Sequence, residues 1–302
     1  MSTQPFLLGI VGDSGSGKNT VADAVAELLG RPRVTDLRLD DYHRYTREER
    51  AGLGLTALNP LVHNFALMQE HLLMLRSGQT VRNRSYEHAD GTFGPIRQIE
   101  PRDVVLVRGL LGYPNDAIRD LYHLTVFLHP EPDLLFRWKL RRDVLFRGYR
   151  EAEVLKSIAS HLLDSKEFVA PQAGRADVVV HYELPDWEAP DSDVLTAITL
   201  RRGAAEALRS TTLLDGLPGV RTQEMDGETM IRLENSIAGE AVAEWARRFF
   251  PETYRQEVAG MYVDEGGETK TRPTLAVVEV LIARLSEVLR ERAGGEQRAA
   301  AV

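Results

Sequence analysis

The chain of 302 residues contains no cysteine, which excludes a disulfide bond, a zinc site with thiolate ligands, a cysteine nucleophile and a thiol redox switch. Positive charge is not in excess, because 37 Lys and Arg side chains face 45 Asp and Glu, a formal net charge of −8. This balance disfavours nucleic acid as a partner. The eight histidines form no His-x-x-x-His or His-Glu-x-x-His pair, which disfavours a dedicated zinc site.

Long hydrophobic runs are missing as well. The first apolar run, residues 6–11, is far shorter than the roughly 18 residues that a membrane helix needs. Residues 1–5 carry no basic segment of the kind that begins a signal peptide. We therefore expect a cytoplasmic protein with no membrane partner. Hydrophobic residues (43%) and charged residues (27%) occur in proportions typical of a folded globular chain.

Short apolar segments alternate with longer segments of helical periodicity. Candidate strands lie at residues 6–11, 35–39, 103–107, 124–128 and 177–180, and candidate helices at 21–29, 65–75 and 134–147. This alternation predicts an α/β fold with a mostly parallel sheet flanked by helices. We expect a first domain over residues 1–190, a smaller α+β region over 191–292 with a helix at 274–292, and a disordered tail at 293–302.

Residues 12–18 fit the pattern G-x-x-x-x-G-K of a phosphate-binding loop (P-loop), between a candidate strand and a candidate helix. Glycines let main-chain N–H groups converge on phosphate oxygens, and the lysine adds a positive charge. The predicted ATP site comprises Gly12, Asp13, Ser14, Gly15, Ser16, Gly17, Lys18, Asn19 and Thr20. A Ser or Thr that ligates Mg²⁺ normally follows the lysine. Because Asn19 stands there, we expect weakened metal binding.

Carboxylates follow the candidate strand at 35–39, at the strand end where sites of α/β proteins form. Further motifs come in order: Asp40-Asp41-Tyr42-His43 with Arg47, residues 54–60 and 63–65, Tyr86-Glu87-His88, residues 138–143 with Arg147-Gly148, and residues 171–172 and 176–177. Over residues 6–185 the chain resembles the phosphoribulokinase family, a branch of the P-loop kinases related to uridine kinase. The fold that this resemblance implies is P-loop kinase-like.

The resemblance implies an ATP-dependent sugar-phosphate kinase that makes ADP and ribulose 1,5-bisphosphate from ATP and D-ribulose 5-phosphate. It implies Mg²⁺ as a cofactor and a homodimer. By the family's pattern Asp40 is the catalytic base, and Lys18, Lys139 and Arg142 act on the phosphates. The resemblance assigns binding of the sugar phosphate to His43, Arg47, Tyr86, His88 and Arg147. It assigns binding of the metal to Asp143 with Asn19. Positions 139, 142, 143 and 147 share one edge of a helix, which would present these charges together.

The match has departures. Arg108 stands where the family's pattern has a glutamate that holds Mg²⁺, and an arginine repels a cation, although it could pair with a phosphate instead. Residues 160–165 and Ala170 lack arginines that the family usually has there. Three functions remain open: an active sugar-phosphate kinase, a catalytically degraded regulator that binds nucleotide, and a uridine or other nucleoside kinase. An uncharged nucleoside would leave the expected charges of His43 and Arg47 unmatched, which disfavours the third.

Overall fold

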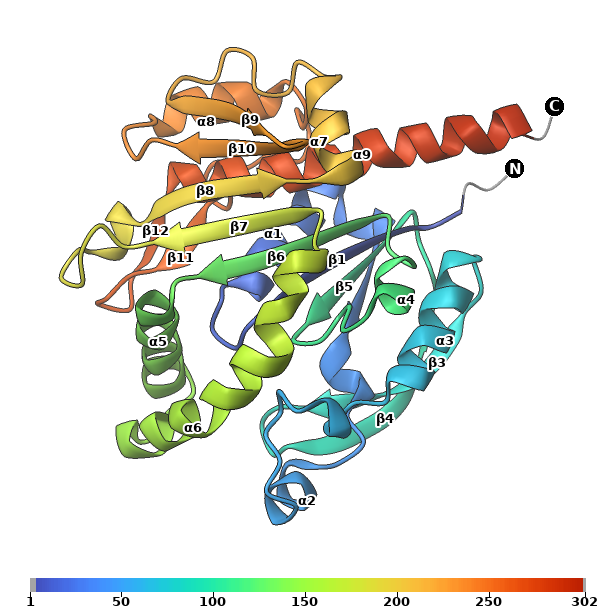
Figure 1. The fold of residues 1–302 in the computed structure, drawn as a ribbon, viewed down its shortest axis with the longest axis vertical. Coiled ribbons are helices and arrows are strands. Elements are labelled where there is room, and N and C mark those ends of the chain that lie inside the picture. Colours follow the sequence, from blue (N-terminus) through green and yellow to red (C-terminus); the bar gives the residue numbers. More distant parts are fainter. Residues whose placement is uncertain (1–3, 301–302) are drawn as a thin grey trace.

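The computed structural model describes residues 4–300, with side chains described as far as residue 295. One large sheet contains β1 (Phe6–Gly12), β2 (Val34–Arg38), β5 (Val104–Gly109), β6 (Leu124–Pro130), β7 (Val178–Glu183), β8 (Leu195–Leu200), β9 (Val220–Met225) and β10 (Glu228–Leu233). Its strand order is β2-β5-β1-β6-β7-β8-β10-β9 (Figure 1). The five strands from β2 to β7 are parallel and the last three are antiparallel, which confirms the mostly parallel sheet.

Helices cover both faces of this sheet (Figure 1). The helices of the described chain, including those that lie away from the sheet, are α1 (Lys18–Leu29), α2 (Arg47–Gly52), α3 (Phe65–Arg76), α4 (Asp116–Arg119), α5 (Pro132–Arg141), α6 (Glu151–Asp164), α7 (Arg202–Arg209), α8 (Gly239–Arg247) and α9 (Pro273–Ala300). Side chains of β1 alternate between the faces: Leu8 and Ile10 belong to the core that includes residues of α1, α7, α8 and α9, and Leu7 and Val11 to the core that includes residues of α3 and α4. Burial on both faces explains why β1 is continuously apolar.

The chain after residue 190 extends the same sheet and the same core. β8 pairs with β7 in antiparallel register, Val180 opposite Ile198, so the sheet is continuous across the boundary expected at residue 190. α9 packs against α1 and includes the helix expected at 274–292. Residues 293–300, for which the composition predicts disorder, continue α9, where their alanines, arginine and glutamine favour the helix and Gly294 and Gly295 disfavour it. Residues 301–302 of that predicted tail lie outside the described residues.

Two hairpins stand apart from the large sheet: β3 (Val81–Glu87) with β4 (Thr92–Ile99), and β11 (Met261–Val263) with β12 (Thr269–Thr271). In the second hairpin the turn joins Val263 to its paired residue Thr269. Between residues 4 and 300, no helix is both long enough and apolar enough to cross a membrane.

Candidate active site

The loop between β1 and α1 has the geometry of an anion cradle. Gly15 and Gly17 adopt φ angles of 98° and 84°, in the left-handed region that favours glycine. A β-carbon at Gly12 would lie 2.6 Å from Ser16 Oγ, so a larger residue would not fit there. Ser16 Oγ is buried and has no hydrogen-bond partner among the described residues. A phosphate oxygen would satisfy this hydroxyl, so the loop fits the ATP that the motif predicts.

Lys18 is the first residue of α1 and points its charge back over the loop. Its Nζ donates a hydrogen bond to the main-chain oxygen of Asp13 at 3.0 Å. Burial lowers the pKa of Lys18 to about 8; the negative charge of Asp40 opposes this shift, and the positive charge of Arg142 adds to it. An anion that enters the loop would therefore stabilise the protonated form of Lys18.

We expect ATP affinity to weaken as the pH rises above about 8. The free protein loses the Lys18 proton near that pH, whereas a bound polyanion raises the pKa of Lys18, so binding takes up a proton there. The dissociation constant of ATP, measured by calorimetry between pH 7 and 9.5, should rise by up to about tenfold per pH unit. In Lys18→Arg the side chain stays protonated, so the dissociation constant of ATP should depend less on pH. The same dependence on pH in both proteins would show that it does not arise from Lys18.

Residues from α5 and from the segment that follows it contact the P-loop. The main chain and Cβ of Lys139 pack against Gly15, where a β-carbon would lie 3.0 Å from Lys139 Cβ. Lys139 Nζ lies 2.9 Å from Nδ1 of His161 on α6, and burial lowers the pKa of His161 to about 4, so the imidazole is neutral and accepts this bond. Arg142 Nη2 donates to Ser14 Oγ at 3.1 Å. Lys139 and Arg142 thus reach the P-loop from α5 and the segment that follows it.

Asp143 and Arg147, predicted for the metal and the sugar phosphate, contact each other in the segment after α5. Asp143 Oδ1 accepts a hydrogen bond from Arg142 Nε at 2.8 Å and lies 3.1 Å from Arg147 Nη1. Two cations therefore share one oxygen of the carboxylate. Within the part of the chain whose side chains are described, no group of three or more acidic or histidine side chains is placed to hold a metal ion.

Arg108, at the end of β5, contacts two carboxylates. Its Nη1 donates to Asp23 on α1 at 3.2 Å, and its Nη2 donates to Asp36 on β2 at 2.7 Å. The positive charge of Arg108 is therefore already matched inside the protein. With Arg108 in place of an acid and Asp143 bound by arginines, these residues do not fit a magnesium ion held by protein carboxylates, although Mg²⁺ can arrive with nucleotide phosphates.

The adjacent residues Asp40 and Asp41, just after β2, lie in different environments. Asp41 is buried, accepts from the Tyr86 N–H at 2.8 Å, and forms ion pairs with Arg38 and Arg97 at 3.2 and 3.1 Å. Its role is structural. Asp40 Oδ2 lies 3.2 Å from His88 Nε2, and no other hydrogen bond to its carboxylate occurs among the described residues.

The Asp40 carboxylate is ionised. Burial acts to raise the pKa of Asp40, but the hydrogen bond from His88, the neighbouring imidazoles of His43 and His88 and the positive charge of Lys18 together hold it well below the usual range. Asp40 and Lys18 are thus close enough to influence each other's ionisation. An anionic carboxylate with a free oxygen can accept a proton from a hydroxyl group.

A cluster of rings borders Asp40. The ring centre of His43 lies 4.9 Å from that of His63 and 4.7 Å from that of Tyr86. Burial lowers the pKa of His43 to about 3, so this side chain is neutral and does not supply the charge expected from the sequence. Both ring nitrogens of His43 and the Tyr86 hydroxyl are buried without a partner among the described residues. Each such group costs about 1–3 kcal/mol, which a polar ligand would recover.

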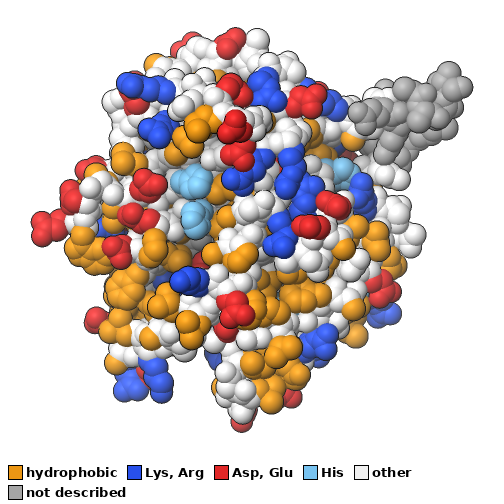
Figure 2. All heavy atoms as spheres, in the orientation of Figure 1, with side chains coloured by type: hydrophobic (Ala, Val, Ile, Leu, Met, Phe, Trp, Pro, Cys, Tyr) orange, Lys and Arg blue, Asp and Glu red, His pale blue; other side chains and the backbone are white. Residues whose placement is uncertain are grey.

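Two arginines of α2, three residues apart, behave differently. Arg47 Nη2 donates to the main-chain oxygen of His88. Arg50 Nη1 is buried and has no hydrogen-bond partner in the described part of the chain. Burial chiefly lowers the pKa values of His43 and His161, and the charge of Arg50 lowers both further, so this charge lies near both imidazoles. α2 and α6, which carry Arg50 and His161, border a notch at the lower edge of the molecule in Figure 2.

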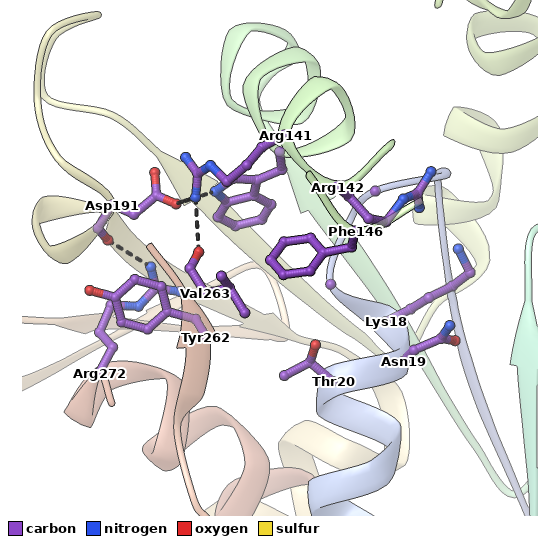
Figure 3. A pocket seen from close by; sticks show the side chains of 13 residues that line it. Lys18, Asn19, Thr20, Arg141, Arg142, Phe146, Asp191, Tyr262, Val263 and Arg272 are labelled. Carbon is purple, nitrogen blue, oxygen red and sulfur yellow. Dashed lines mark hydrogen bonds and ion pairs between the residues drawn. The ribbon is translucent and has the colours of Figure 1, made fainter. Parts of the chain in front are cut away.

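A cavity of about 240 Å³ opens beside the P-loop (Figure 3). Its lining residues are Gly15, Gly17, Lys18, Asn19, Thr20, Trp138, Arg141, Arg142, Phe146, Asp191, Tyr262, Val263 and Arg272. The end at the loop is polar, and the other end combines aromatic side chains with charged ones. The predicted ATP residues therefore border a space that α5 and the β11–β12 hairpin also line.

The family model described as "Phosphoribulokinase / Uridine kinase family" matches residues 7–186, more than half of the chain. The chain belongs to this family. Membership in the phosphoribulokinase / uridine kinase family confirms the resemblance that the motifs indicated, and the matched range contains every predicted site residue.

Individual relatives within this family carry both names. A phosphoribulokinase from Synechocystis sp. is 36% identical over 174 residues, 58% of this chain and 52% of the relative. A uridine kinase from Chloroflexus aurantiacus is 32% identical over 185 residues, 59% of this chain and 88% of the relative. The chain spans about half the length of the curated phosphoribulokinases that it matches. The solved phosphoribulokinase from Rhodobacter spheroides has a TM-score of 0.60 at 17% identity, over 83% of this chain and 99% of the other, which shows a shared fold.

Three residues that the structure places near the predicted site were not among the predicted site residues: Arg50, His63 and His161. Arg50 lies in the turn of helix after the motif arginine Arg47, and His63 belongs to a motif segment, so both had local signals. His161 had none, because its contact with Lys139 joins residues that are 22 positions apart on separate helices.

Proposed function

We propose that this protein transfers the terminal phosphoryl group of ATP to a hydroxyl group of a small anionic sugar, of the ribulose 5-phosphate type. The observation that carries the proposal is the ionised carboxylate of Asp40, which keeps a free oxygen and lies within electrostatic reach of Lys18 on the P-loop. The name of the Synechocystis relative supports the same acceptor class.

Different residues of the chain stabilise the phosphates and accept the proton. When bound, ATP supplies the phosphoryl group and leaves as ADP. Lys18, Lys139 and Arg142 surround the loop with positive charge, which stabilises the negative charge that moves during transfer. His88 holds one oxygen of Asp40, so the other oxygen is left to take the proton of the acceptor hydroxyl.

On the acceptor side, neutral His43 and Tyr86 offer polar atoms without partners, and Arg50 offers an unpaired guanidinium N–H. A sugar hydroxyl can both donate to and accept from such groups, and a phosphate suits the arginine. An acceptor that carries hydroxyl groups and one anionic group therefore matches this cluster better than an uncharged nucleoside.

The test is a direct assay of the purified chain with ATP, Mg²⁺ and either ribulose 5-phosphate or uridine. The proposal expects ribulose 1,5-bisphosphate at a rate well above that of Asp40→Asn. Faster phosphorylation of uridine than of any sugar phosphate would overturn the assignment of the acceptor.

The second candidate is a regulator that binds nucleotide without turnover. The ion pairs of Arg108 with Asp23 and Asp36 favour it, because they stand where the family's pattern has an acid for Mg²⁺. Tight ATP binding, together with product formation no faster than in Asp40→Asn for every sugar phosphate tried, would support this candidate.

Arg50→Gln should raise the KM for the anionic acceptor about 10- to 100-fold, because a hydrogen bond to a charged group contributes about 1.5–3 kcal/mol. The KM for ATP should change little. The matched control is Arg47→Gln, which removes the same charge from the same helix, but from a side chain already bonded to the His88 carbonyl. Steady-state kinetics of both variants decide: an effect confined to Arg47→Gln would return the acceptor contact to the residue that the family resemblance assigns.

A further inference from the structure

The cavity beside the P-loop has two chemically different ends. At one end lie the main chain of Gly15 and Gly17 and the side chains of Lys18 and Asn19, which suit phosphates. Figure 3 shows Tyr262 and Val263 on the other side of Phe146 from Lys18 and Asn19. Tyr262 and Val263 belong to β11, outside residues 7–186 that the family model matches.

The far end is an open aromatic surface. Phe146 is 54% exposed although it lines a cavity, and Trp138 and Tyr262 are only partly buried. Nucleobases stack on such faces, and the phosphate end fixes where the rest of a nucleotide would extend. A cavity with one phosphate-binding end and one aromatic end has the composition of a nucleotide site.

Hydrogen-bond donors without acceptors border the same end. Arg141 Nη2 and Arg272 Nε are buried and have no hydrogen-bond partner in the described part of the chain, although Arg141 Nη2 lies 3.9 Å from Glu265 Oε1, and both residues line the cavity. A guanidinium group only donates, so a ligand that satisfies these groups must carry acceptors. The ring nitrogens and carbonyl oxygens of a nucleobase are such acceptors.

Hydrogen bonds around Asp191 connect the β11–β12 hairpin to α5. Its buried carboxylate accepts from Arg141 at 2.5 Å and from Trp138 Nε1 at 3.0 Å, and its main-chain oxygen accepts from Arg272 at 3.0 Å. Arg141 Nη1 also donates to the main-chain oxygen of Val263 at 2.9 Å (Figure 3). The hairpin is therefore held in place before any ligand binds, which lowers the entropic cost of binding.

We propose that the β11–β12 hairpin, through Tyr262 and Val263, forms one wall of the nucleobase site and faces Phe146 across it. The C-terminal region then takes part directly in nucleotide binding. The two-ring surface of a purine fits a site lined by three aromatic side chains better than a pyrimidine does. This inference rests on the proposed function in one respect, namely that a nucleoside triphosphate binds at the P-loop.

The experiment compares ATP with inorganic tripolyphosphate, which has the phosphates but no base. Calorimetry on the full chain measures both affinities for wild type, Tyr262→Ala, Tyr262→Leu and Phe146→Ala. Each variant should bind ATP about tenfold more weakly, the loss of one stacking partner, and bind tripolyphosphate as the wild type does. Tyr262→Leu keeps apolar bulk in the hairpin and guards against loss of folding. The matched control is Trp187→Ala, which removes an aromatic side chain that is 55% exposed and does not line the cavity.

The outcomes separate the inference from the proposed function. Unchanged ATP affinity in the Tyr262 variants, or an equal loss of ATP and tripolyphosphate, would overturn the nucleobase wall. If the wild type bound neither ligand, the proposed function and the nucleobase wall would both be overturned. Tighter binding of CTP or UTP than of ATP by the wild type would contradict the purine preference.

Discussion

Asp40→Asn should lower kcat about 10²- to 10⁴-fold, the range over which a positioned general base contributes. An amide cannot accept the acceptor's proton, but it can still meet the His88 ring, whose Nε2 lies 3.2 Å from Asp40 Oδ2. The dissociation constant of ATP should change far less than kcat. Single-turnover assays and calorimetry on the same preparation measure the two quantities separately.

The neighbouring variant Asp41→Asn is the matched control. It makes the same chemical change one position along, but Asp41 is buried and forms ion pairs with Arg38 and Arg97. Its main effect should be a lower thermal midpoint, because removing one charge leaves both arginines without their partner. If Asp41→Asn lost turnover at full stability while Asp40→Asn stayed active, the assignment of the base would be wrong.

Arg108→Glu should destabilise the fold by about 2 kcal/mol or more, because it replaces two ion pairs with three carboxylates. Arg108 is mostly buried and bonds to Asp23 and Asp36, although both carboxylates remain partly open to solvent, which limits the effect. Denaturant unfolding of wild type and variant measures the difference. The family's pattern, which has a glutamate for Mg²⁺ at this position, would instead favour a restored dependence on metal.

The charge-removing variant Arg108→Met separates the two effects. It loses the ion pairs without adding a third carboxylate, so its loss of stability should be smaller than that of Arg108→Glu. Adding Asp36→Asn to Arg108→Met should recover part of the loss, because one unpaired carboxylate is removed. A gain in stability of Arg108→Glu when Mg²⁺ is added would instead support the expectation from the family's pattern.

Local sequence patterns predicted correctly those features that depend on interactions between residues close together in the chain. The P-loop follows from glycine spacing, because only a few backbone conformations allow its N–H groups to converge, and the strand before it follows from a continuous apolar run. The position of Asp40 after a strand likewise predicted that its carboxylate lies at the sheet edge. The disordered tail was a weaker inference, since composition alone does not say whether a preceding helix such as α9 will continue.

The sequence by itself determined the α/β order of elements, the phosphate-binding loop and the family, since each depends on residues close together in the chain. The tertiary structure decided which of two adjacent aspartates is free, that Arg108 is neutralised by residues 72 and 85 positions away, and that a hairpin near residue 262 lines the cavity of the P-loop. Charges and cavities depend on distances in space. Those distances are set by how the sheet and helices pack, so a linear motif does not contain them.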